Sequence, residues 1–129
     1  MFIQNLNKEQ QSAFLFLAQE LIKADGTLEK AEVAILETLK QQTFPDTTEK
    51  EIALDKLPQV FNTKIATNSA LLELIAIAHA DEQYHENEKS LISTYAQAFN
   101  VNQDTLFLLE TWVKKQIELS KEAMQLLNQ

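Results

Sequence analysis

One apolar stretch decides the fold of this chain: LLELIAIAHAD, at residues 71–81. Apolar side chains occupy nearly every side of the helix that this stretch would form, and helices of that kind lie at the centre of a domain. The three residues 67–69 offer helix caps just before it. We therefore expect a buried, central helix from Ala70 to Ala80.

A second copy of this stretch lies 56 residues earlier, as LFLAQELIKAD at residues 15–25. Each copy predicts two helices joined by a short acidic turn, and such a hairpin cannot bury its apolar face alone. We expect two halves, at about 7–43 and 68–100, to pack on each other about a pseudo-twofold axis. Past the turn, an aspartate, an apolar residue and a glutamate recur at the same spacing in Asp25, Leu28 and Glu32 and in Asp81, Tyr84 and Glu88.

The spacing of apolar residues in the rest of the chain also predicts helices. Together they predict an all-α bundle of five main helices plus one or two short ones, in a single domain spanning 1–129. A last long helix, capped by Asn102, is expected at about 102–128. Its Phe107, Leu108 and Trp112 are expected in the core, with an exposed partner groove as the alternative. The other expected helices are 7–24 behind an Asn7–Gln10 capping box, 29–42, a short one capped by Thr48 and Glu51, a short piece at 58–61, and one through Leu91 that Asn100 stops.

Composition excludes several classes of function. The chain has 19 Asp and Glu against 11 Lys and Arg, a net charge of -8, which repels nucleic acid and anionic lipid. It has no cysteine, so disulfides and thiolate-bound metals are excluded. Residues 1–8 lack the pattern of a signal peptide, and no apolar run approaches the length that spans a bilayer. A cytoplasmic protein without membrane insertion is the expectation.

The acidic turns have two interpretations. Asp25, Glu32, Asp81 and Glu88 can cap the following helices, because carboxylates are favoured beside unpaired N–H groups at a helix start. They can also supply oxygen ligands to a divalent cation, if the two turns lie close together. Glu82 stands where the first copy has Gly26, so a left-handed backbone there would be strained.

The two histidines give a different alternative. His79 and His85, with Asp81 and Glu88, contain the donor types that bind zinc or nickel. A metal-dependent enzyme or metal-sequestering protein would use this cluster. The sequence contains no Gly-rich phosphate loop and no Gly-x-Ser-x-Gly elbow. No catalytic residue is therefore assigned, and a protein that is not an enzyme is expected.

The turn at residues 24–32, ADGTLEKAE, resembles the Ala-Asp-Gly-x-Ile-x-x-x-Glu signature of the tellurite-resistance TerB family and of the related N-terminal domain of DjlA-type co-chaperones. Residues 80–88 resemble its second copy. The resemblance implies an all-helical bundle in stress or membrane-linked complexes, with acidic residues that hold a divalent metal. We therefore expect a non-enzymatic, acidic interaction module of a bacterial stress-response system, with a protein partner and a divalent cation at the paired turns.

Overall fold

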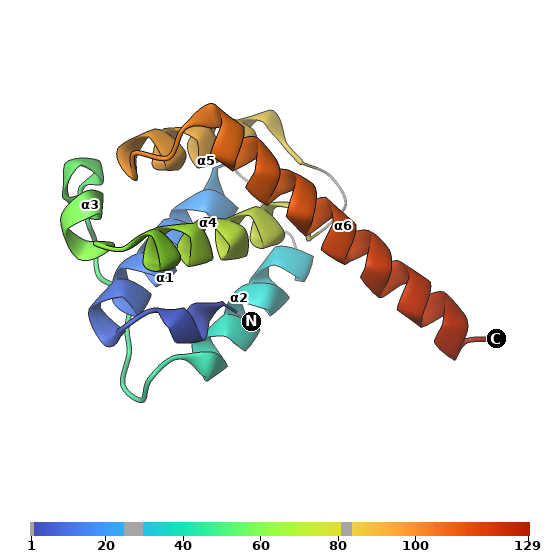
Figure 1. The fold of residues 1–129 in the computed structure, drawn as a ribbon. Coiled ribbons are helices and arrows are strands. Elements are labelled where there is room, and N and C mark those ends of the chain that lie inside the picture. The colour runs from blue at the N-terminus through green and yellow to red at the C-terminus, as the bar shows by residue number, and fades with distance from the viewer. Residues whose placement is uncertain (1, 25–29, 81–83) are drawn as a thin grey trace.

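The computed structural model describes residues 2–24, 30–80 and 84–129. These residues form an all-helical bundle and contain no strand, which confirms the predicted fold class (Figure 1). The α-helices are α1 (Lys8–Lys23), α2 (Lys30–Gln42), α3 (Leu57–Val60), α4 (Lys64–Ala78), α5 (Glu86–Ala98) and α6 (Gln103–Leu127), and 3-10 turns lie at η1 (Ile3–Asn5) and η2 (Leu54–Lys56).

The two halves repeat in register. The step from the start of α1 to the start of α4 is 56 residues, and α2 and α5 are related by the same step at both ends. Equivalent positions are buried in both copies, for example Leu36 with Ile92 and Leu39 with Tyr95. The sequence repeat is therefore also a repeat of helix boundaries and of the faces that the helices bury.

Helix α4 lies at the centre of the bundle, as its apolar sequence predicts (Figure 1). It packs against α1, α2, α5, α6 and η1, and α1 and α5 also pack against each other. Each half thus contributes helices to the environment of the other, and one continuous core results. The fully buried side chains of Leu71, Leu74 and Ile75 come from this helix.

Helix α4 begins earlier than predicted. It starts at Lys64, and Thr63 caps it by accepting a hydrogen bond from the Ala66 N–H at 3.1 Å. Thr67, one of the expected caps, is instead buried inside the helix and donates to the Phe61 carbonyl at 3.3 Å. Residues that can cap a helix are present at both sites, and the helix uses the earlier one, which places Ala66 and Thr67 in buried positions of its first turns.

One predicted helix is absent. Residues 48–53 are irregular, so Thr48 and Glu51 cap no helix, and Leu54, which the predicted helix would include, lies in the 3-10 turn η2. The segment is tied to the body by a hydrogen bond from the Lys50 N–H to the Ser12 carbonyl at 3.1 Å. This tertiary contact competes with a helix that would be too short to be stable alone.

The other helix ends agree with the sequence. Asn7 and Gln10 form the expected capping box, and Asn102 accepts from the Thr105 N–H at 2.8 Å. Asn100 ends α5 with a positive φ of 63°. Its N–H and that of Val101 bond back to Gln97 and Ala96, the pattern of a Schellman cap. None of the helices in the described ranges has the length and hydrophobicity needed to cross a membrane.

Candidate functional site

The pair of acidic turns is the first candidate site. Asp25 and Asp81 lie outside the described residues, as does Glu82, so the predictions for these three side chains remain untested. Glu32 and Glu88 are described. Each is the third residue of its helix, as predicted, and each is fully buried. The two carboxylates therefore occupy equivalent, water-excluded positions in the two halves.

The described residues that flank the two turns are neighbours. The side-chain amide of Asn87, in the first turn of α5, donates to the carbonyl of Ala24, the C-cap residue of α1, at 3.1 Å. Glu32 and Glu88 lie at the positive ends of their helices, where N–H groups lack intrahelical partners. Their burial at this position favours a capping role for them over a solvent-accessible cation site.

The histidine cluster is the second candidate. His79 follows the last residue of α4, and His85 precedes the first residue of α5 without a side-chain cap bond. The described residues contain no group of three or more acidic or histidine side chains that could hold a metal ion. The predicted cluster also includes Asp81, which lies outside the described residues.

Tyr84 packs against this cluster. Its ring centroid lies 4.3 Å from that of His79, with the planes tilted by 52°. Burial raises the pKa of the Tyr84 hydroxyl, and the negative charges of Glu110, Glu88 and Glu86 raise it further. Tyr84 is therefore held as the neutral phenol, and it packs against the hydrophobic core beside His79.

A cleft of about 490 Å³ lies between the starts of α4 and α6. Lys64 is the charged residue that lines it, and the other polar groups are amides and hydroxyls of threonine and asparagine. The cleft lining includes no Ser, Cys, His, Asp or Glu, so its threonine hydroxyls have no carboxylate or imidazole beside them to act as a general base. Its remaining lining residues are Pro58, Phe61, Asn62, Thr63, Thr67, Asn68, Phe99, Asn100, Val101, Asn102 and Thr105.

The exposed face of α6 is the third candidate, and it corrects the prediction that Phe107, Leu108 and Trp112 lie in the core. These side chains are 68%, 66% and 41% exposed. The contact of α6 with the body uses a different stripe, in which Leu106 and Val113 are buried and Leu109 and Ile117 are partly buried. Helix α6 therefore has two apolar faces, and the bundle covers one of them.

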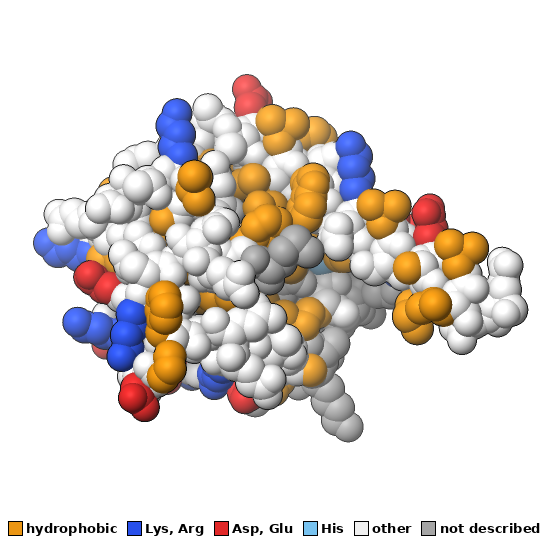
Figure 2. Space-filling view, turned by 60° about the horizontal axis from the view of Figure 1, so that its bottom comes forward, with side chains coloured by type: hydrophobic (Ala, Val, Ile, Leu, Met, Phe, Trp, Pro, Cys, Tyr) orange, Lys and Arg blue, Asp and Glu red, His pale blue; other side chains and the backbone are white. Residues whose placement is uncertain are grey.

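The second face continues beyond the body. The C-terminal part of α6 projects away from the other helices (Figure 1), and every residue from 118 to 129 is exposed. Leu119 is 59% exposed and Leu126 is 68% exposed. Figure 2 shows hydrophobic side chains gathered on this projecting part. The signal for Leu119 and Leu126 was present in the sequence, because they follow Trp112 at steps of seven residues, the repeat of a helix that packs on another helix.

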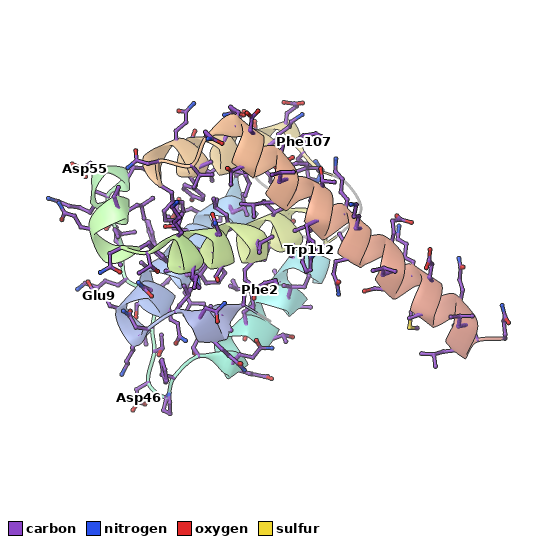
Figure 3. The ribbon with its side chains drawn as sticks, in the orientation of Figure 1. Phe2, Glu9, Asp46, Asp55, Phe107 and Trp112 are labelled. Carbon is purple, nitrogen blue, oxygen red and sulfur yellow. The ribbon has the colours of Figure 1, made fainter. Side chains whose placement is uncertain are left out.

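Trp112 joins this face to the body. Its ring meets that of Phe2 edge-to-face, with the centroids 5.6 Å apart, and the two lie near each other below α6 in Figure 3. Phe107 is five residues from Trp112, so it points about 140° away around the helix. We therefore treat Phe2 and Trp112 as one surface and Phe107 as separate from it.

Comparisons of the chain with protein-family models, with curated proteins and with solved structures found no match. The resemblance to the TerB family therefore rests on the two acidic signatures and on the helix pairs that carry them.

Proposed function

We propose that this chain is a non-enzymatic helical module that binds a protein through the outer face of α6. One observation carries the proposal: α6 has a second apolar face, which the rest of the described chain covers only at Trp112, where Phe2 packs against the ring. Contiguous exposed apolar surface is costly in water, and it marks interaction sites in soluble domains. Aromatic residues such as Trp112 are enriched in the centre of such interfaces.

The rest of the molecule supports a binding role over catalysis. The lining of the cleft between α4 and α6 includes no carboxylate, imidazole or thiol, so its threonine hydroxyls have no such group beside them to act as a general base. The two buried glutamates have a sufficient role at their helix starts, and Tyr84 is held in its neutral form. The repeated acidic signature supports placing this module in a tellurite-resistance-like stress system, as an acidic component of a larger assembly.

Photo-crosslinking in cells tests the proposal. A photoreactive amino acid at Leu119 is expected to give a discrete crosslinked protein, because Leu119 lies in the proposed interface. The matched control is the same amino acid at Gln125, which is also exposed but lies about 120° away around α6. Equal crosslinking at both positions, or none at Leu119, would show that this face is not a binding surface. Mass spectrometry of the product distinguishes a second copy of the chain from a different protein.

A further inference from the structure

The outer face of α6 has a regular composition. We call the residues Leu108, Trp112, Lys115, Leu119, Glu122 and Leu126 the outer stripe. Their spacing alternates between four and three residues, which places them on one side of a helix over about 27 Å. All six are exposed. Such a stripe is the seam along which helices pair side by side.

The charges within the outer stripe select a partner and an orientation. We infer that the outer stripe pairs with the outer stripe of a second copy of this chain, with the two α6 helices antiparallel and crossing at Leu119. A twofold axis there brings Lys115 of each copy close to Glu122 of the other, since the two residues lie almost equally far from Leu119. It also brings Trp112 of each copy opposite Leu126 of the other. This is the reciprocal contact that a twofold interface requires.

The parallel alternative is disfavoured by the same residues. It would place Lys115 against Lys115 and Glu122 against Glu122, and like charges in direct contact oppose association. Within the described residues neither Lys115 nor Glu122 makes an ion pair, so both are available to a partner. An antiparallel pair therefore brings together opposite charges at Lys115 and Glu122, two from each copy, that the single chain leaves in solvent.

The distribution of charge over the whole chain also favours an interface formed by the C-terminal part of α6. Residues 111–127 contain three Lys and two Glu, a net charge of +1, so the rest of the chain carries -9. Two copies repel each other through their acidic bodies. In the antiparallel pair, the two bodies lie at opposite ends of the joined helices, so the repelling charges are far apart and the weakly positive segments meet.

The C-terminal part of α6 lacks the side-chain packing that stabilises most helices. A helical segment gains most of its stability from packing its apolar face, and short isolated helices are marginal in water. The ten residues 118–127 are helical with every side chain exposed. A second α6 laid along them would bury Leu119 and Leu126 and supply the packing that the rest of the described chain does not.

Sedimentation equilibrium of the purified chain tests this inference, which rests on the proposed function of α6. A concentration-dependent dimer is expected. Leu119→Glu places two like charges at the axis and should weaken the dimer by at least about 100-fold, while the helical circular dichroism of the bundle is retained. Gln125→Glu adds the same charge outside the outer stripe and should leave the dimer constant within about threefold.

A charge exchange provides an independent test that does not depend on an apolar residue. Lys115→Glu and Glu122→Lys should each weaken the dimer, because each variant faces like charges across the axis. The double variant, or an equimolar mixture of the two single variants, should restore dimerisation because opposite charges meet again. Failure of both to restore it would overturn the antiparallel pairing.

Disulfide formation reports the orientation directly, because the chain has no cysteine of its own. Leu119→Cys should oxidise to a covalent dimer, since the two residues meet at the axis. Leu108→Cys should not, because antiparallel helices place the two copies of residue 108 at opposite ends. Efficient crosslinking at both positions would establish a parallel pair and overturn the inference. A chain that is monomeric at all concentrations would also overturn it, and crosslinking of Leu119 to a different protein would then leave the proposed function standing.

Discussion

Helices α4 and α6 are both rich in apolar residues, but they have opposite environments. Helix α4 contributes fully buried leucines and isoleucines to the core. Helix α6 buries Leu106 and Val113, but seven of its large hydrophobic side chains are exposed. The difference arises because α4 is surrounded by other helices and α6 lies at the edge of the bundle (Figure 1). Apolar composition therefore indicates that a helix needs neighbours, and it does not indicate whether the same chain supplies them.

The largest expected effect is on the free energy of unfolding, and it compares a buried leucine of α4 with an exposed leucine of α6. Leu74→Ala in α4 should lower the free energy of unfolding by about 2–5 kcal/mol, because it leaves a cavity in a fully buried site. Leu126→Ala in α6 should change it by less than about 0.5 kcal/mol at concentrations where the chain is monomeric. Urea denaturation of both variants checks the pair. A similar loss in both would mean that the end of α6 is packed within a single chain.

The next effect compares the two halves of the repeat. Glu32→Ala and Glu88→Ala should each lower the free energy of unfolding by about 0.5–2 kcal/mol, the range for a lost helix cap. The two losses should be similar, because the residues occupy equivalent buried positions. Glu118→Ala, on the exposed part of α6, serves as the control and should have little effect. A large loss of unfolding free energy for one variant and none for the other would show that the two turns are not equivalent.

Tyr95 gives a smaller effect with a defined dependence on pH. Its hydroxyl donates to the Leu17 carbonyl at 3.2 Å, so Tyr95→Phe should cost about 0.5–1.5 kcal/mol. Burial, and then the charge of Glu20, raises the pKa of Tyr95 above its ordinary value of 10.0. Because the folded state favours the protonated phenol, its contribution is complete below pH 10 and is lost as the pH rises above that value. Denaturation between pH 8 and about 11 should show a shallower decline in Tyr95→Phe than in the unchanged chain.

The smallest expected effect is on the acidic turns, where the capping interpretation predicts no response to metal. Millimolar calcium, magnesium or manganese should leave the melting temperature unchanged. A saturable increase would instead indicate binding to the folded state. If Asp25→Asn combined with Asp81→Asn then abolished that increase, the cation interpretation of the turns would be established.

Several features could be predicted because their causes are local or periodic. The capping box at Asn7, the stop at Asn100 and the cap at Asn102 depend on residues within a few positions of one another. The repeat predicted two equivalent helix pairs and the equivalence of Glu32 and Glu88. The prediction of a short helix capped by Thr48 and Glu51 was wrong, because a local cap pattern gives no information about the competing hydrogen bond from Lys50 to Ser12.

The amino-acid sequence by itself determined the helical class, the central helix and the 56-residue repeat, since these follow from apolar spacing and from short-range caps. Only the tertiary structure decided which apolar face of α6 meets the bundle and which remains exposed. Leu106 and Trp112 are both apolar residues of one helix, yet the first is buried and the second is 41% exposed. The physical reason is that burial depends on which other segments reach a face, and residue spacing within one helix carries no information about them.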